Sequence, residues 1–373
     1  MRLSAAERSA SATRTVGVWS VGERAVAGAR SSKLTSMVVT GSASMATAVS
    51  RAKAASRSAC ASSSAALAAA ASHAQPYPAA PITLVVPAAA GGTTDLAGRM
   101  LAQTLTPVVG QQVVVDNKAG GNGAIAASLV KRAPADGYTL LMQYSGYHVI
   151  SPHLMKQQQW ELADFQPIAN VLSAPQIIVV RDDVPARTLA ELVAYAKANP
   201  GTLNYASSGN GSLQHVTGAM LEQQAGIKMT HVPYKGTGPA LQDLLAGQVQ
   251  LTFGTAPPFM QHIAAGKLRV LAVTGKERLP SLPDVPTTAQ AGYPKLTPTS
   301  WFALFAPAAV PRDIATKLAA DVQKVMADAG FKQKALEQGA TADYLSPPQL
   351  GDKVKVDYAE WAQVIKASKI EAD

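Results

Sequence analysis

Three strand–loop–helix junctions hold the residue types that could do chemistry in this chain. They read "PAAAGGTTD" (87–95), "SSGNGSLQH" (207–215) and "YKGTG" (234–238). Glycine lets a ligand approach the backbone closely, and a helix start offers unpaired N–H groups with about half a positive charge. Each junction is therefore a candidate anion site. A structural turn is the alternative, because α/β proteins need glycine in tight turns regardless of function.

The glycine spacing does not fit a nucleotide-binding loop. The chain contains no G-x-x-x-x-G-K-[ST] sequence, and neither "GGTTDLAG" nor "GNGSLQ" has the G-x-G-x-x-G spacing. The first junction also lacks a lysine that could hold a polyphosphate. The junctions therefore indicate a smaller anion, and we expect no cofactor.

Serine and histidine side chains near the second junction could instead perform catalysis. Ser207, Ser208 or Ser212 could act as a nucleophile, with His215 as its base. However, Ser212 and His215 share a helix start, where hydroxyls commonly cap, and the chain has no G-x-S-x-G elbow. The other histidines lack the spacing of metal ligands. The sequence therefore favours a binding protein with no catalytic residue and no metal.

The composition describes a globular protein without a nucleic-acid footprint. The chain has 373 residues, a length that suggests about two domains. Of these residues, 47% are hydrophobic and 15% are charged, as in a globular protein. The formal net charge is +9, of which residues 1–76 contribute +7 and residues 77–373 only +2. Nucleic-acid binding requires clustered basic residues on the folded part, so we expect no nucleic-acid partner.

The first 76 residues are rich in Ala and Ser and predict a leader. A basic stretch after Met45, the run "AALAAAA" and a cleavage site near Ala74 have the form of a secretory signal. Met37 or Met45 is then the expected start, and a disordered cytosolic tail is the alternative. The single cysteine, Cys60, lies in this leader, with Arg57 where a lipid anchor would need an aliphatic residue. A cysteine-free body suits an oxidising compartment, so we expect a periplasmic protein.

From residue 82 onward the chain alternates short apolar runs with helical patterns. We expect strands over 82–86, 112–116, 138–143, 176–180, 203–206, 229–234, 249–253, 268–273 and 300–307. We expect helices near 94–106, 122–132, 188–198, 212–225, 239–246, 311–327 and 351–368. Apolar strands without alternation indicate parallel sheets covered on both faces. No apolar run of about 18 residues follows the leader, so we expect no membrane span.

The pattern predicts an α/β protein of two lobes with a cleft between them, each lobe a mostly parallel sheet flanked by helices. Residues 77–174 and 297–373 would form the first lobe, and residues 175–296 the second. The chain then crosses twice between the lobes, and the crossing segments could act as a hinge. Ligands in open α/β sheets bind at the carboxyl ends of the strands, where all three junctions would lie.

Longer blocks of the chain, in order over residues 77–373, extend this pattern. They read "YPAAPITLVVPAAAGGTTDLAGRMLA", "VVVDNKAGGNGAIAA", "ADGYTLL", "LNYASSGNGSLQHVTGAML", "HVPYKGTGPALQDLLAGQVQLTF", "GKLRVLAVTGKERLPSLPDVPTTAQAGYP" and "SWFALFAP". Together these blocks resemble the Bug-type solute-binding receptors of tripartite tricarboxylate transporters. The resemblance implies a type II-like periplasmic binding fold whose two lobes close on a small carboxylate.

The resemblance also implies which residues contact the ligand. The first and second junctions would hold a carboxylate through backbone amides, hydroxyls and ordered waters, and the third would contribute less. Asp95 would shape its loop rather than touch an anion. Independently of the resemblance, Tyr144, Ser145 and Tyr147 follow the strand expected at 138–143 and could line the cleft or belong to a plain loop. The expected ligand-binding residues are Ala90, Gly91, Gly92, Thr93, Thr94, Asp95, Ser145, Ser207, Ser208, Gly209, Gly211, Ser212, His215, Tyr234, Lys235 and Gly236.

The chain departs from the family pattern near the expected cleft. The first loop reads "PAAAGG" where the family often has an aromatic residue and further prolines. Gly254 and Thr255 follow Phe253 where the family commonly has an Asp-Asn pair, and Gln290 stands where the family usually has Glu. The region of Gly254 and Thr255 bears on the far end of the ligand, so the ligand's identity does not carry over from the family.

The sequence thus predicts a receptor that captures a small carboxylate by lobe closure: a di- or tricarboxylate, an aromatic acid or an amino acid. Its partners would be the integral membrane subunits of a tripartite tricarboxylate-type transporter, and the receptor itself would be a monomer. A ligand sensor for a signalling partner is the first alternative. A hydrolase on the same fold, using Ser207 or Ser208 with His215, is the second.

Overall fold

The computed structural model describes residues 77–155, 157, 159–368 and 370. The expected leader, its cleavage site near Ala74, Cys60 and both candidate start residues lie outside the described residues. Within the described ranges, no helix is long and apolar enough to cross a membrane.

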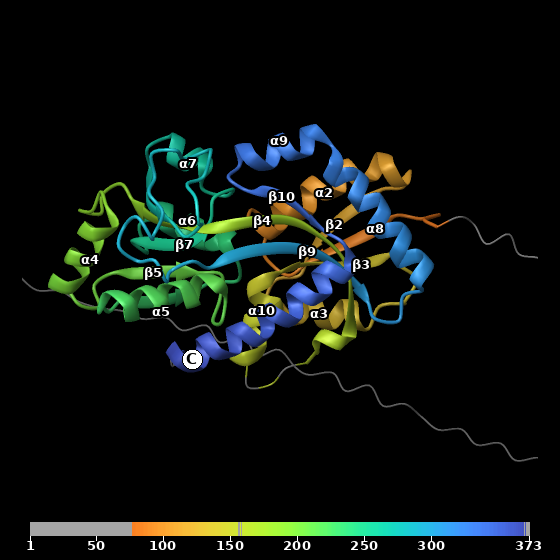
Figure 1. Cartoon of the computed structure of the whole chain (residues 1–373), viewed down its shortest axis with the longest axis horizontal. Helices are drawn as coiled ribbons and strands as arrows, with labels where there is room; N and C mark the ends of the chain where they lie inside the picture. The colour runs from red at the N-terminus through yellow and green to blue at the C-terminus, as the bar shows by residue number, and fades with distance from the viewer. Residues whose placement is uncertain (1–76, 156, 158, 369, 371–373) are drawn as a thin grey trace, which may run out of the picture. The chain divides into compact units, whose positions relative to one another are not determined.

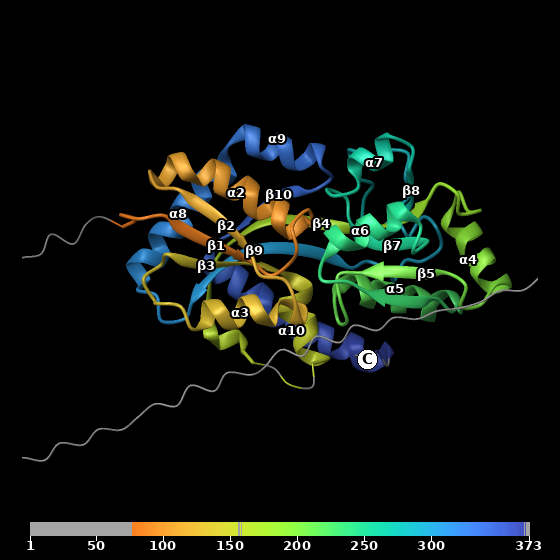
Figure 2. The ribbon, with the colours of Figure 1, turned by 180° about the vertical axis from the view of Figure 1, so that it is seen from behind.

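The first lobe is built on a mixed sheet with helices on both faces. Its strands are β1 (Ile82–Val86), β2 (Val113–Asn117), β3 (Thr139–Tyr144), β9 (Thr299–Pro307), β10 (Thr341–Leu345) and the first part of β4 (Phe165–Arg181). Strand β1 pairs in parallel with β2 and β3, whereas β9 runs antiparallel to β3 and β4. Figures 1 and 2 show one face covered by α2 (Thr93–Val109), α8 (Arg312–Ala327) and α9 (Ala329–Glu337), and the other by α3 (Ala124–Lys131) and α10 (Pro347–Ser368).

The second lobe repeats this arrangement on a smaller scale. Its sheet combines the second part of β4 with β5 (Asn204–Ser207), β6 (Thr230–Pro233), β7 (Leu251–Thr255) and β8 (Leu268–Val273). Figures 1 and 2 place α6 (Thr237–Ala246) and α7 (Met260–Ala264) on one side of it, α5 (Leu213–Ala225) on the other and α4 (Leu189–Ala198) at the end of the lobe. Along β4, Ile177 and Val179 face one core while Ile178 and Val180 face the other, which is the two-residue period of a strand buried on both faces.

Two long strands, β4 and β9, join the lobes. Strand β4 pairs with β9 from Phe165 to Pro175 and then with β7 and β8 from Gln176 to Arg181. It therefore leaves one sheet and enters the other within a single residue step. In Figures 1 and 2, β4 and β9 run side by side between the two groups of helices.

The structure corrects two expectations about the sheets. Strand β1 pairs in parallel with β2 and β3, and β5 pairs in parallel with β6 and β7. However, β4 and β9 pair antiparallel with all their partners, so the sheets are mixed rather than mostly parallel. Burial on both faces produces the same apolar run in either orientation, so the pattern could not distinguish them. The first part of β4 was also missed; it contains Pro167 and Pro175, and proline within a run argues against a strand. Register shifts against β9 after Pro167 and after Asn170 accommodate this segment in the sheet.

Candidate functional site

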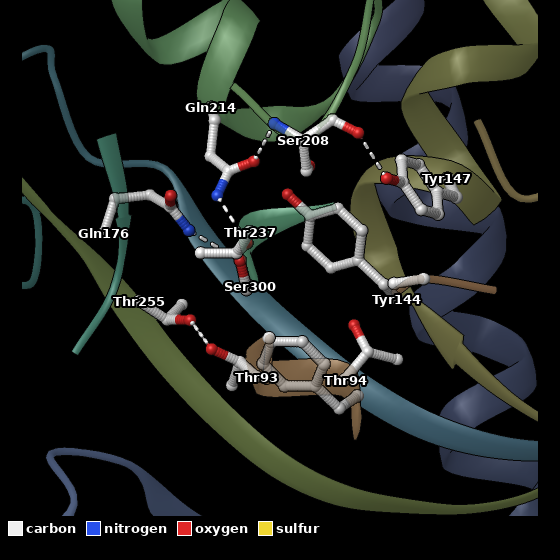
Figure 3. Close-up of a pocket in the computed structure, with 13 residues that line it drawn as sticks. Thr93, Thr94, Tyr144, Tyr147, Gln176, Ser208, Gln214, Thr237, Thr255 and Ser300 are labelled. Carbon is white, nitrogen blue, oxygen red and sulfur yellow. Dashed lines mark hydrogen bonds between the residues drawn. The ribbon is translucent and has the colours of Figure 1, made fainter. Parts of the chain in front are cut away.

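A small cavity lies between the two lobes. The ends of β3 and β7, the starts of α2, α5 and α6, and the joining strands β4 and β9 surround it. Figure 3 shows the side chains that converge on it. The lining residues are Ala88, Gly92, Thr93, Thr94, Tyr144, Tyr147, Gln176, Ser208, Gln214, Thr237, Thr255, Ser300 and Phe302.

No lysine, arginine, histidine or carboxylate side chain is among these lining residues. The only ionisable groups are the phenols of Tyr144 and Tyr147. Burial raises the pKa of Tyr144 far above its ordinary value and that of Tyr147 to about 12, so both are neutral at physiological pH. Elsewhere in the described part of the chain, no group of three or more His, Cys, Asp or Glu side chains could hold a metal ion. Any charge complementarity for an anion must therefore come from N–H groups and helix dipoles.

The start of α2 presents its backbone to the cavity. Its N-cap is Gly92, which provides no side-chain hydrogen bond to the first turn. Asp95 instead accepts a 3.0 Å hydrogen bond from the Gly91 N–H, and its carboxylate also binds Arg99 and Asn117. Asp95 is 2% exposed and does not line the cavity. Its carboxylate therefore fixes the loop, while the N–H groups of the first turn have no side-chain cap.

The start of α6 faces the cavity from the second lobe. Its N-cap, Gly236, has φ +125°, a conformation that favours glycine, and it too makes no side-chain cap hydrogen bond. Thr237 lines the cavity, and its Oγ1 accepts a 3.0 Å hydrogen bond from Gln214 Nε2. Two helix starts without side-chain caps thus approach one cavity from opposite lobes.

The start of α5 is organised differently, because side chains of the helix start accept hydrogen bonds from backbone N–H groups. Ser212 Oγ accepts a hydrogen bond from the His215 N–H, as an N-cap. The Ser208 N–H donates to Gln214 Oε1 at 2.6 Å, and the Ser208 carbonyl accepts from the Tyr147 hydroxyl at 2.6 Å. Ser208 is therefore held at both backbone groups. Its Oγ, on a side chain 6% exposed that lines the cavity, has no hydrogen-bond partner among the described residues.

The histidines near the second junction support this loop from behind. Ser207 Oγ lies 2.6 Å from His231 Nε2, and the rings of His231 and His215 stack with centroids 4.1 Å apart. His215 Nδ1 accepts a hydrogen bond from the Gly211 N–H. Burial, with a smaller contribution from His215, lowers the pKa of His231 to about 3. In the hydrolase alternative, Ser207 or Ser208 would pair with His215. In the structure, Ser207 pairs with His231, and Ser207 is fully buried outside the cavity lining.

Hydrogen bonds cross the cavity from one lobe to the other. Thr93 Oγ1 and Thr255 Oγ1 share a 2.6 Å hydrogen bond, and the Leu213 N–H donates to the Tyr144 phenol oxygen at 3.2 Å. Outside the cavity, the Ala89 N–H donates to the Lys235 carbonyl at 3.2 Å. The first junction of one lobe thus touches the third junction of the other.

The structure brings part of the predicted site together. Gly92, Thr93, Thr94 and Ser208 line the cavity. Ser145 Oγ accepts from the Trp301 N–H, and Tyr234 donates to Asp243, so both side chains are engaged elsewhere. The predicted residues that do not line the cavity are Ala90, Gly91, Asp95, Ser145, Ser207, Gly209, Gly211, Ser212, His215, Tyr234, Lys235 and Gly236.

Tyr144 and Tyr147, which were considered as possible cleft residues after the strand at 138–143, line the cavity. Thr255 also lines it and ends β7, in the region expected to bear on the far end of the ligand. Gln176 and Ser300 were not predicted, because they lie on the joining strands, where the sequence offers no loop or glycine signal. The other lining residues that were not predicted are Ala88, Gln214, Thr237 and Phe302.

A family model and several known proteins are similar to this chain. Residues 97–370 match the family described as tripartite tricarboxylate transporter family receptor. BugT of Bordetella pertussis is 34% identical over 295 residues, which cover 79% of this chain and 90% of BugT. The solved structure of R. palustris Rpa4515 with adipate is 36% identical with a TM-score of 0.77, covering 79% of this chain and 99% of that chain. MatC from Rhodopseudomonas palustris with bound malate is 30% identical with a TM-score of 0.74, covering 78% of this chain and 100% of that chain.

Proposed function

This chain belongs to the tripartite tricarboxylate transporter family of receptors, and we propose that it captures a small organic carboxylate in the periplasm and delivers it to the membrane subunits of such a transporter. Its fold is that of the two-lobed periplasmic binding proteins. The observation that carries the proposal is the neutral cavity between the glycine N-caps of α2 and α6. Relatives in the family have been solved with adipate and with malate, which are carboxylates.

A carboxylate fits these two helix starts for electrostatic reasons. Burying an anion without compensation is costly, and the cavity offers no cationic side chain to pair with it. Helix N-termini supply oriented N–H donors and a positive dipole end without any ionisable group. The free hydroxyl of Ser208 and the hydroxyl of Thr94 add donors that can rotate toward the ligand. This donor set suits an anion with several acceptor oxygens.

Capture would proceed by closure of the lobes around the ligand. We propose residues 77–174 with 297–373 as one moving unit and residues 175–296 as the other, with β4 and β9 absorbing the hinge motion. Closure brings the N-terminal ends of α2 and α6 to the same ligand, so a carboxylate stabilises the closed arrangement more than the open one. The hydrogen bonds between the lobes contribute to the same equilibrium.

The test of this function is a thermal-shift and calorimetric screen of the purified protein against carboxylates, inorganic phosphate and neutral sugars. A carboxylate at 100 times its dissociation constant should add about 2.7 kcal/mol to the free energy of unfolding. For a protein of this size, that raises the melting temperature by roughly 3–5 °C. A shift with phosphate or sugars, and none with any carboxylate, would show that the proposed ligand class is wrong.

The hydrogen bond between Thr93 and Thr255 should contribute to binding affinity. Thr93→Val and Thr255→Val remove the shared hydrogen bond with little change in side-chain volume. Each single variant should lose about 1 kcal/mol of binding free energy, or roughly five-fold in affinity. The double variant should lose no more than either single one, because the bond is already broken. Calorimetric titration with the best carboxylate of the screen measures all three, and Thr316→Val on the exposed face of α8 is the matched control.

Additive losses in the double variant would contradict this prediction. They would show that the two hydroxyls act separately on the ligand rather than through the bond that they share across the lobes.

A further inference from the structure

We propose that the face of the cavity formed by Gln176, Ser300 and Thr255 recognises a neutral hydrogen-bond donor on the ligand, so that this receptor prefers monocarboxylates with a hydroxyl or amide group over dicarboxylates. The inference rests on the proposed function, since it concerns the part of a bound carboxylate that lies away from the helix starts. In the view of Figure 3, these three side chains lie on the left of the cavity, on the opposite side from Thr94 and Tyr147.

Gln176 is the central residue of this face, and its backbone is held in place. Its N–H donates to Thr274 Oγ1 at 2.8 Å, and its carbonyl accepts from the Thr274 N–H at 2.8 Å. Gln176 Nε2 donates to Ser300 Oγ at 2.7 Å, which links the two joining strands β4 and β9. The side chain is therefore fixed at its backbone and at one end of its amide.

The other end of that amide has no partner. Gln176 is 1% exposed and lines the cavity, and among the described residues nothing donates to its Oε1. A buried acceptor without a donor is unfavourable, and a ligand N–H or O–H placed against it removes this cost. A ligand carboxylate at the same place would bring two acceptors together.

Charge points to the same class of ligand. A second carboxylate on this face would be buried without a cation, because no basic side chain lines the cavity. Lys235, the basic residue of the third junction, is exposed and outside the lining. An ammonium group would lack an anion equally, since Asp95 lies outside the lining and is engaged by Arg99 and Asn117. A neutral donor is the one group that satisfies Gln176 Oε1 without introducing an unpaired charge.

Thr255 completes the face of the cavity that it forms with Gln176 and Ser300. Its hydroxyl is already used in the bond to Thr93, so it cannot substitute for a cation. The side chain is 5% exposed and closes the cavity next to β7. The two joining strands and the end of β7 thus present one free acceptor, on Gln176, together with hydroxyls that are already hydrogen-bonded.

The test is calorimetric titration of the full protein with six-carbon acids that differ only at the far end: hexanoate, 6-hydroxyhexanoate, adipic acid monoamide, adipate and 6-aminohexanoate. A four-carbon series of butyrate, 4-hydroxybutyrate, succinamate and succinate covers a shorter ligand. The hydroxy acid and the monoamide should bind at least ten-fold more tightly than the diacid of the same length. In the six-carbon series, the hydroxy acid and the monoamide should also bind at least ten-fold more tightly than 6-aminohexanoate.

Gln176→Leu keeps the approximate volume of the side chain and removes the acceptor. In this variant, the advantage of the hydroxy acid over hexanoate or butyrate of the same length should disappear, whatever the variant's affinity for the unsubstituted acid. The order of affinities that the wild-type protein shows for these acids can be measured without the variant. That order alone can therefore overturn the inference. It is overturned if the diacids bind as tightly as the hydroxy acids or more tightly, and the proposed function then stands. If none of the carboxylates binds but phosphate does, the proposed function itself has failed.

Discussion

Replacing Gly238 with alanine is expected to weaken ligand binding strongly while leaving the protein folded. A Cβ atom at this position would lie 2.1 Å from the carbonyl oxygen of Ala90 in the opposite lobe. The Cβ position is fixed by the backbone of residue 238, and the oxygen belongs to the backbone of Ala90, so neither atom can rotate away. The lobes therefore cannot reach the arrangement in which the starts of α2 and α6 share one cavity. If closure becomes rare, the apparent affinity falls by the same factor as the closed population. We expect a loss on the order of 100-fold, measured by calorimetry with the best carboxylate.

Stability separates this effect from misfolding. Gly238 lies in the first turn of α6, where alanine is the better helix former, so the melting temperature should stay the same or rise slightly. Gly351→Ala is the matched control, because a Cβ there would meet only Pro167 Cγ at an ordinary 3.5 Å. The control should bind like the wild type. An unchanged affinity for Gly238→Ala would mean that the first and third junctions are not in contact when ligand is bound.

Acid should destabilise the protein through a buried histidine. His148 is 1% exposed, and its ring lies among Trp160, Phe305 and Trp301. Burial lowers its pKa to about 3, compared with about 6.5 in an unfolded chain. Between about pH 3 and pH 6.5, the histidine is therefore protonated in the unfolded state and neutral in the folded state. The stabilisation is complete above about pH 6.5 and is lost progressively as the pH falls toward 3.

The slope of stability against pH measures this contribution. One such histidine contributes up to about 1.4 kcal/mol per pH unit between these limits, and His231, whose pKa is also lowered to about 3, adds in the same direction. His148→Phe keeps an aromatic ring in the cluster and removes the titrating group. Urea unfolding at several values between pH 4.5 and pH 7 should show a shallower slope for the variant, whatever its stability at pH 8. Equal slopes would show that burial does not lower the pKa of His148 in the folded protein.

Local patterns were sufficient for most elements of the fold. The run 82–86 is β1, and the helices near 188–198, 212–225 and 311–327 fall within a residue or so of α4, α5 and α8. These signals work because helix and strand periodicity and helix caps involve residues close together in the chain. The Ser212 N-cap of α5 is an example, since the serine and the N–H that it accepts from are three residues apart.

The candidate site was only partly predictable for the opposite reason. Its glycine junctions are local features, but their relation to one another depends on contacts between the lobes. Sequence proximity suggested that Ser207 or Ser208 pairs with His215, whereas parallel pairing of β5 with β6 brings Ser207 to His231 instead. Gln176 and Ser300 are separated by 124 residues and carry no motif.

The sequence alone determined the two-lobed α/β architecture, the glycine-rich helix starts and the resemblance to carboxylate receptors, because these depend on neighbouring residues and on ordered blocks of sequence. Only the tertiary structure decided which helix starts meet without side-chain caps, which histidine supports the second junction, and which amide faces the cavity. The pairing of residues far apart in the chain depends on the packing of the whole molecule rather than on any local pattern.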